Sequence, residues 1–285
     1  MKKIALLLLA LLAGFANAQT NKNNTLLWKI SGNGLSKPSY LFGTIHITCD
    51  ATLSAKVKTA LDNTQQLCLE LDMDDPNMQG EMMMKMMMKD GVTMKSLASA
   101  EDFKIVDDFL KAEVGFSAEM LNTVKPFMVS AMLYPKMLPC EMQSVETELQ
   151  KISKAQNEEV IGLETVSEQL DVFDAISYKD QMDELVKTAK SNLKRDTTEM
   201  NAMLDMYKSE NIEAMVDFTK KSDNVMTSKY VDELLNNRNQ NWISRIDKIA
   251  KEKSTFFGVG AAHLGGEKGV IALLRKAGFK VEPVN

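Results

Sequence analysis

The chain contains only two histidines, and both close the same kind of phrase. His46 and His263 each end a Gly-x-x-His pattern that begins at Gly43 and Gly260, directly after an apolar run. An apolar run that stops at a glycine is typical of a strand that delivers the next side chains to the carboxyl edge of a sheet, where open α/β sheets bind their ligands. The repeated pattern therefore predicts that two imidazoles meet at one site.

Two acidic residues occupy a similar position in other apolar segments. Glu70 ends a strand-like segment that follows the first Gly-x-x-His phrase, and Asp72 lies two residues further on the same face. Glu164 ends a comparable segment in the middle of the chain. A carboxylate at the end of an apolar strand is costly to bury unless it binds a cation or acts on a substrate. Glu70 and Glu164 are therefore candidate site residues.

The candidate set, His46, Glu70, Glu164, Arg238 and His263, suits two kinds of chemistry. Two histidines and a carboxylate can hold a divalent ion with open positions for water, as hydrolytic metal sites require. The same groups can also act without metal, with the carboxylate taking a proton from water and the histidines polarising the electrophile. Arg238, on a late polar helix, could clamp a carboxylate or stabilise an oxyanion, but a solvated helix face explains it as well.

The elements that must position these residues follow a duplicated plan. A helix and then a strand are expected after each Gly-x-x-His phrase, at 57–63 and 67–71 after the first and at 269–277 and 279–284 after the second. Residues 26–30 and the segment after Pro38 predict a hairpin at the amino end, and 159–165 predicts a strand that leads into a helix at 166–175. The sequence thus predicts an α/β fold. Its central sheet has two related strand–Gly-x-x-His–helix–strand halves, separated by a large helical insertion at roughly 76–235.

The first 18 residues follow the pattern of a secretory signal peptide. Lys2 and Lys3 precede an apolar run at 4–12, and Ala16-Asn17-Ala18 resembles a cleavage site. Cleavage would leave 285 − 18 = 267 residues, enough for one substantial domain at 19–285. No later apolar run is long enough to span a bilayer. We therefore expect an exported protein, periplasmic or secreted.

The charge of the chain excludes some partners. The formal charge is −5, and loss of the two leader lysines makes it −7. A net negative charge argues against nucleic acid or an anionic membrane surface as the partner.

Three cysteines are expected to fall into two classes. Cys68 lies inside an apolar strand-like segment and predicts a buried free thiol. Cys49 and Cys140 lie at loop positions, so in an oxidising compartment we expect them to form a disulfide. Three reduced, inert thiols remain the alternative, because connectivity cannot be read from one sequence.

A run of six methionines around one lysine, at 82–88, has two interpretations. Thioethers favour Cu(I), which suggests a soft-metal site. Consecutive methionines on a helix point all round it, however, whereas ligands must share one face. Because methionine is a good helix former and an adaptable packer, a helical flap or an adaptable substrate groove is the preferred interpretation.

Six phrases, taken together and in order, resemble the TraB/GumN family, which is related to the Tiki proteins and, more distantly, to the erythromycin esterase and ChaN-like fold. The resemblance covers essentially the whole chain after the leader. The phrases lie at 27–30, 38–46, 69–72, 161–169, 237–239 and 259–264.

The resemblance implies that His46 and His263 are the histidines of the two Gly-x-x-His motifs and that Glu70 is their acidic partner, with Glu164 and Arg238 as further site residues. It also implies a divalent-metal-dependent peptidase, with Mn, Co or Zn held by His46, Glu70 and His263 and with a peptide or protein as substrate. Two alternatives stay open. One is a ChaN-like module that binds haem, iron or another ligand, and the other is a non-enzymatic inhibitor that sequesters a peptide.

Overall fold

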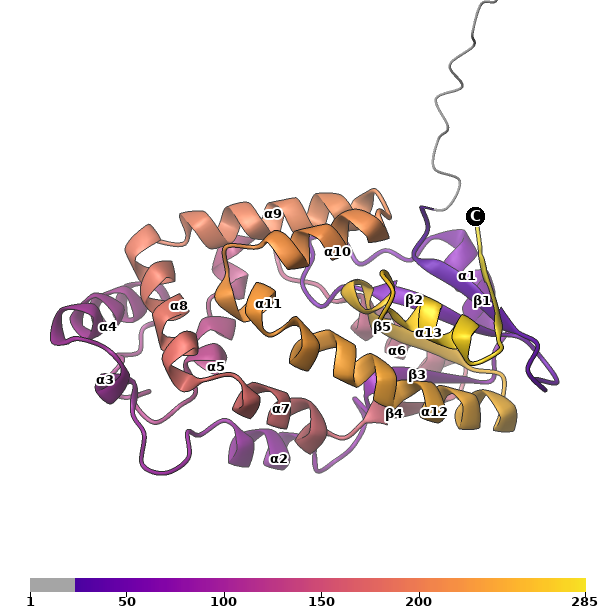
Figure 1. Ribbon diagram of the computed structural model, residues 1–285, viewed down its shortest axis with the longest axis horizontal. Coiled ribbons are helices and arrows are strands. Elements are labelled where there is room, and N and C mark those ends of the chain that lie inside the picture. The colour runs from indigo at the N-terminus through magenta and orange to yellow at the C-terminus, as the bar shows by residue number, and fades with distance from the viewer. Residues whose placement is uncertain (1–23) are drawn as a thin grey trace, which may run out of the picture.

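The computed structural model describes residues 24–285, so the predicted leader at 1–18 lies outside the described residues. A six-stranded sheet forms one end of the molecule, and helices form the other (Figure 1). The strand order is β4-β3-β5-β2-β1-β6. The strands are β1 (Leu27–Ser31), β2 (Ser39–Thr44), β3 (Gln66–Leu71), β4 (Glu159–Glu164), β5 (Phe256–Gly260) and β6 (Lys280–Pro283).

The four strands β2, β5, β3 and β4 run parallel, so their carboxyl ends meet at one edge of the sheet. The two strands that carry the Gly-x-x-His phrases are neighbours: Gly43 pairs with Val259 and Thr44 with Gly260. These parallel strands are mostly apolar and mostly buried, as is usual where both faces of a sheet are covered. β1 pairs antiparallel with β2 and with β6, which confirms the predicted hairpin.

The two predicted halves are both present, β2-α1-β3 and β5-α13-β6. They diverge in where the last strand goes. β3 inserts between β5 and β4, whereas β6 lies at the opposite edge of the sheet beside β1. The connection after β2 and the connection after β5 lead toward opposite edges of the sheet. The two strands themselves are neighbours, so the two histidine phrases lie side by side.

Most helices of the insertion lie in the left half of the view in Figure 1, away from the sheet, whereas α6 packs against β3 and β4. There α4 and α5 pack against α8, α10 packs against α9, and α2 packs against α7. α12 runs along the sheet end and contacts β4 and α13. The α-helices are α1 (Ala55–Asp62), α2 (Met78–Lys85), α3 (Met94–Leu97), α4 (Ala100–Val114), α5 (Pro126–Ala131), α6 (Val145–Ala155), α7 (Val166–Ala175), α8 (Tyr178–Ser191), α9 (Lys194–Lys208), α10 (Ile212–Lys221), α11 (Val225–Lys229), α12 (Asn237–Glu252) and α13 (Val270–Lys276).

Three further elements are short. The 3-10 helices η1 (Tyr134–Met137) and η3 (Ala261–His263) each form about one turn, and η3 holds the second Gly-x-x-His phrase. The π-helical turn η2 (Asp232–Asn236) runs directly into α12. Such π turns occur mostly as single-turn features inside α-helices, often at functional sites.

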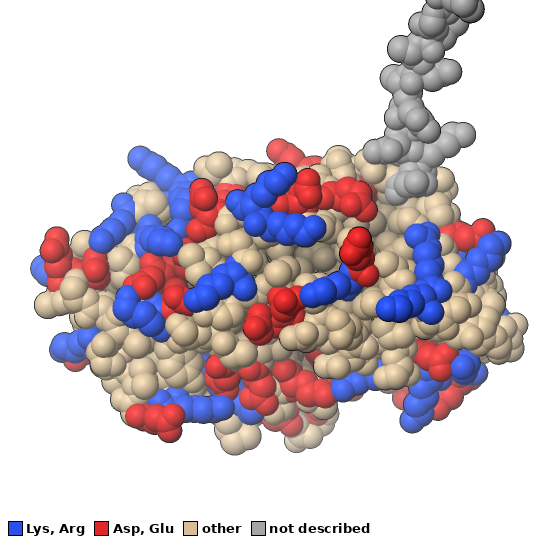
Figure 2. All heavy atoms as spheres, in the orientation of Figure 1, with Lys and Arg blue, Asp and Glu red and all other residues tan. Residues whose placement is uncertain are grey.

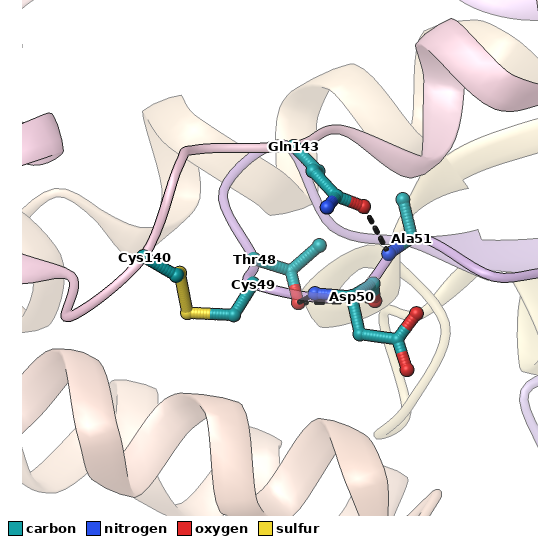
Figure 3. The surroundings of a disulfide bond; sticks show 6 residues. All are labelled: Thr48, Cys49, Asp50, Ala51, Cys140 and Gln143. Atoms are coloured by element: carbon teal, nitrogen blue, oxygen red, sulfur yellow. Dashed lines mark hydrogen bonds between the residues drawn. A yellow bond between two sulfur atoms is a disulfide. The ribbon is translucent and has the colours of Figure 1, made fainter.

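A disulfide joins Cys49 to Cys140, with 5.7 Å between their Cα atoms, as predicted (Figure 3). Cys68 is a buried free thiol in β3, also as predicted, and burial raises its pKa above the ordinary range. Beside the disulfide, Thr48 and Gln143 form an antiparallel bridge, and the Gln143 side chain accepts a hydrogen bond from the Ala51 N–H. These contacts fasten the loop after β2 to the segment that leads into α6.

The methionine run is divided between two environments. Met82, Met83 and Met84 are exposed on α2, and Met87 is exposed although its backbone bridges to Val124, whereas Met88 is buried. The helical part agrees with the expected helix, and a groove function for it stays a prediction. Over residues 24–285, none of the helices has the length and apolar character needed to cross a membrane.

Candidate functional site

The glycines of both Gly-x-x-His phrases are required by close packing. A Cβ added to Gly43 would lie 2.7 Å from Cδ1 of Leu264, the residue that follows the second phrase. A Cβ added to Gly260 would lie 3.3 Å from Oε1 of Glu70. Each glycine thus lets another part of the site approach the end of its strand.

Glu70 projects from β3 onto the end of β5. Its Oε1 accepts a hydrogen bond from the Gly260 N–H at 2.7 Å and lies 3.7 Å from Nε2 of His263. Its Oε2 accepts hydrogen bonds from Arg238 at 2.6 Å and from Gln169 at 3.1 Å. The carboxylate therefore joins the second Gly-x-x-His phrase to the first turn of α12.

Arg238 uses all five of its N–H groups inside the protein. Nε donates to Glu164, and Nη2 donates to Glu70 and Glu164. Nη1 donates to the Leu234 carbonyl at 3.0 Å and to Nε2 of His263 at 3.2 Å. No N–H is left to clamp a substrate carboxylate or an oxyanion in this arrangement. The guanidinium instead neutralises buried carboxylates.

His263 is held as the neutral tautomer that carries its proton on Nδ1. The Asn239 amide nitrogen donates to the carbonyls of His263 and Lys268, so its oxygen must accept the 2.6 Å bond from Nδ1. Arg238 can only donate, so Nε2 must accept from it. The Nε2 lone pair therefore faces Glu70 and Arg238.

His46 lies in a more open position. Its side chain is 62% exposed, and Nδ1 lies 2.8 Å from Oε1 of the buried Glu146 on α6. Ser144 also donates to Glu146, at 2.7 Å. The pair depends on the fastened loop described above, where the Val145 N–H donates to the carbonyl of Ile45. A carboxylate on one ring nitrogen is the usual device that orients a ligating or catalytic histidine.

The surroundings of His263, Glu70 and His46 shift the pKa of each group away from its ordinary value. Burial lowers the pKa of His263 to about 3, so this imidazole is neutral at pH 7. Burial opposes the charge of Glu70, but the positive charges of His263, Arg238 and His46 outweigh it and lower its pKa to about 2. Because His263 is neutral at pH 7, Arg238 is the main charge that keeps Glu70 ionised there. For His46, the hydrogen bond to Glu146 and the charge of that carboxylate raise the pKa to about 9.

Glu164 completes the cluster from the end of β4. The Trp242 indole N–H donates to it at 3.1 Å, and Gln169 spans Glu164 and Glu70 with its amide nitrogen. The Trp242 ring is fully buried and lies against both Arg238 and His263, with centres 4.9 Å and 4.5 Å away. Residues from β3, β4, α7, α12 and η3 thus meet in one hydrogen-bonded network.

A cavity of about 380 Å³ opens beside this network, between α7 and the start of α12. Arg238 and Glu164 form its inner wall. Its lining is mostly charged, with Glu168, Asp171, Glu233 and Arg245 among the outer residues. Figure 2 shows acidic side chains gathered over α7 on this face of the molecule.

The family model that describes the TraB/PrgY/gumN family matches residues 26–283. The chain belongs to the TraB/PrgY/gumN family. A curated relative, the metalloprotease TIKI2 of Danio rerio, is 22% identical over 314 aligned residues, which cover 91% of this chain and 61% of the relative. The chain therefore spans about three fifths of the length of that relative. No solved structure gave a significant match.

In this TraB/PrgY/gumN protein, the histidine and carboxylate side chains of the site are of the types that bind divalent ions. Imidazole and carboxylate are ordinary ligands of Zn²⁺, Mn²⁺ and Co²⁺, and His263 offers an unprotonated Nε2 that faces Glu70. Among residues 24–285, however, no three His, Cys, Asp or Glu side chains already stand together as a metal-binding group. Arg238 contacts the atoms that would bind the ion.

The structure brings four of the five predicted residues into direct contact: Glu70, Glu164, Arg238 and His263. His46 follows the neighbouring strand and acts on the pKa of Glu70 and His263 through its charge. Asp72 does not join the cluster, since its carboxylate accepts a hydrogen bond from the Asp74 N–H in the turn after β3.

Sequence reasoning gave no site role to four residues that contact these groups. Asn239 and Trp242 lie on the same helix as Arg238, and Gln169 lies in a phrase shared with the family, so a signal for each was present. No apolar strand or motif marks Glu146 as a site residue. The only signal for it is that it follows Cys140 by six residues, and Cys140 is tied to the loop of His46.

Proposed function

We propose that this protein is an exported hydrolase that cleaves a peptide or protein substrate with water activated between His46, Glu70 and His263. The observation that supports this most strongly is the position of Glu70. An ionised, buried carboxylate lies 3.7 Å from an unprotonated imidazole nitrogen, at the edge of the sheet where both Gly-x-x-His phrases end. A carboxylate and an imidazole nitrogen at this separation suit the binding of a water molecule or a divalent ion by both groups.

The residues have distinct roles in this proposal. Glu70 binds an ion or accepts a hydrogen bond from the water, and the Gly260 N–H holds the carboxylate in place. Asn239 fixes the tautomer of His263 that leaves Nε2 unprotonated, and Glu146 orients His46 through its Nδ1. A divalent ion of Mn, Co or Zn, held by His46, Glu70 and His263, would supply the Lewis acidity that lowers the pKa of bound water.

The disulfide supports the exported location. Disulfides persist in secreted and periplasmic proteins and are rare in the cytosol. The bond between Cys49 and Cys140 lies next to the loop of His46, so an oxidising compartment would also help to shape the site.

The test combines metal analysis with a cleavage assay. Protein purified without chelator should carry a divalent metal, and a peptide library should be cleaved when Mn²⁺, Co²⁺ or Zn²⁺ is added. Glu70→Gln keeps the shape of the side chain and should abolish both cleavage and metal uptake while the circular dichroism spectrum stays native. Glu213→Gln removes one acidic residue that lines a separate cavity, and it serves as the control. Full activity in Glu70→Gln would contradict the proposal, and a haem absorption band would point to a binding module instead.

A further inference from the structure

The guanidinium of Arg238 contacts the donor atoms that a bound ion would need. Nη1 lies 3.2 Å from Nε2 of His263, and Nη2 lies 2.6 Å from Oε2 of Glu70. A divalent metal binds such atoms at about 2.0–2.2 Å. The Nε2 atom has a single lone pair, so it cannot accept from Arg238 and bind an ion at the same time. The arginine and the ion must compete for His263.

The charges of the cluster favour the ion over the arginine. Glu70 and Glu164 are two buried acidic side chains, 8% and 5% exposed, and they share the single positive charge of Arg238. A divalent ion carries twice that charge. Buried charge without compensation is costly, so the site with arginine alone retains an attraction for a cation.

A place for the displaced side chain lies beside the cluster. Arg238 forms part of the wall of the 380 Å³ cavity, together with Glu233. Glu233 belongs to the π turn η2 and precedes Arg238 by five residues, the hydrogen-bonding interval of a π helix. A carboxylate on the same side of the chain can therefore receive the guanidinium after a side-chain rotation.

We propose that Arg238 is an exchangeable cation: it holds the site together in the metal-free protein, and it swings into the cavity beside Glu233 when a divalent ion binds Glu70 and His263. This exchange rests on the proposed metal-dependent function, and in it Arg238 sets the metal affinity of the site. Metal binding then has to displace five hydrogen bonds, so the arginine lowers the apparent affinity of the site.

The decisive variant is Arg238→Lys, titrated with Mn²⁺ by isothermal calorimetry after chelator treatment. Lysine keeps the positive charge but lacks the planar fork that reaches several acceptors at once. The dissociation constant for Mn²⁺ should therefore fall by about tenfold. Arg245→Lys makes the same change at another arginine of the cavity wall, one that pairs with Glu168, and should leave the constant unchanged.

A double-mutant cycle tests the second position of the arginine. Glu233→Gln should weaken Mn²⁺ binding by about threefold, because the displaced guanidinium loses its partner. In the Arg238→Gln background, Glu233→Gln should leave Mn²⁺ binding unchanged, since there is no guanidinium for Glu233 to bind. If Arg238→Gln does not fold, the Arg238→Lys result decides the competition by itself.

Three outcomes overturn the exchange. Equal or weaker Mn²⁺ binding by Arg238→Lys, with normal binding by the wild type, would show that the arginine does not compete, and the proposed hydrolase would stand. An undiminished effect of Glu233→Gln in the Arg238→Gln background would remove the second position. Peptide cleavage by wild-type protein that binds no Mn²⁺, Co²⁺ or Zn²⁺ would overturn the exchange and the metal together and leave the hydrolysis intact.

Discussion

At the scale of single residues, Asn239 has the most demanding position in the site. Its amide is buried and makes three hydrogen bonds, one accepted from His263 and two donated to backbone carbonyls. Its orientation follows from these partners and determines which nitrogen of His263 carries the proton. A side chain two positions away from it, Asn241, is exposed on the same helix and makes none of these contacts.

Replacement of Asn239 by alanine should destabilise the protein by about 1–3 kcal/mol, because a buried N–H and two buried carbonyls lose their partner. Urea unfolding followed by tryptophan fluorescence measures the change. Asn241→Ala should stay within about 0.5 kcal/mol of the wild type. Similar losses in both variants would contradict the assigned role of Asn239.

The residue scale also shows what the sequence could and could not predict about the site. The two histidines, Glu70 and Glu164 were found because each follows or ends an apolar strand, a local pattern. Glu146 was missed because its partner His46 lies one hundred residues earlier, and nothing local marks the pair. The full engagement of Arg238 depends on four separate elements and could not be read from any one of them.

At the scale of elements, the loop of His46 is held by a covalent bond and by backbone pairing. The disulfide, the Thr48–Gln143 bridge and the Val145–Ile45 hydrogen bond all join the same two segments. The disulfide closes a loop with a sequence separation of 91 residues. A cross-link across a loop of this length removes much conformational entropy from the unfolded chain, which stabilises the folded state.

Cys49→Ser/Cys140→Ser should therefore be less stable than the wild type by about 2–4 kcal/mol. Thermal melts with and without reductant measure this difference. Reductant should lower the melting temperature of the wild type towards that of the variant and leave the variant unchanged. A wild-type protein that is equally stable in both conditions would show that the bond contributes little.

The start of α7 provides a pH-dependent contribution to stability. Thr165 and Glu168 form a reciprocal capping box, and Arg245 makes a two-pronged ion pair with Glu168. The hydrogen bond from Arg245 is the main reason why the pKa of Glu168 falls to about 2. A depressed folded-state pKa stabilises the fold above the unfolded value, near 4.5, and this stabilisation is lost as the pH falls towards 2.

Glu168→Gln should consequently flatten the acid side of the stability profile. Between about pH 4.5 and pH 2 the wild type should lose more stability than the variant, by a small amount because the carboxylate is 45% exposed. Chemical unfolding at several pH values gives both curves. Parallel curves across this window would refute the contribution of the Glu168–Arg245 pair.

The boundaries of helices can be predicted from the sequence only where a local motif marks them. The helix predicted at 166–175 coincides with α7, and a local capping motif of Thr165 and Glu168 marks its start. The π turn η2 was not predicted. Its Leu234 carbonyl accepts a hydrogen bond from the Arg238 side chain, whose other partners are distant in sequence, and no local propensity marks the turn.

At the scale of the whole molecule, the sheet end and the helical insertion share one hydrophobic core. A single cluster of buried residues includes Leu67 and Phe256 of the sheet together with Phe103 and Leu185 of the insertion. A smaller cluster around Ile176, Met226 and Tyr230 lies under α11. One continuous core predicts that the two parts unfold together, in keeping with the single domain expected from the sequence.

Differential scanning calorimetry should therefore give one transition whose calorimetric and van't Hoff enthalpies agree. Two probes report on the two parts: both tryptophans lie in the sheet end, on β1 and α12, whereas far-ultraviolet circular dichroism reports mainly on the helices of the insertion. Their melting curves should coincide. An insertion that melts first would mean that the contacts of Phe103 and Leu185 with the sheet core are too weak to couple the two parts.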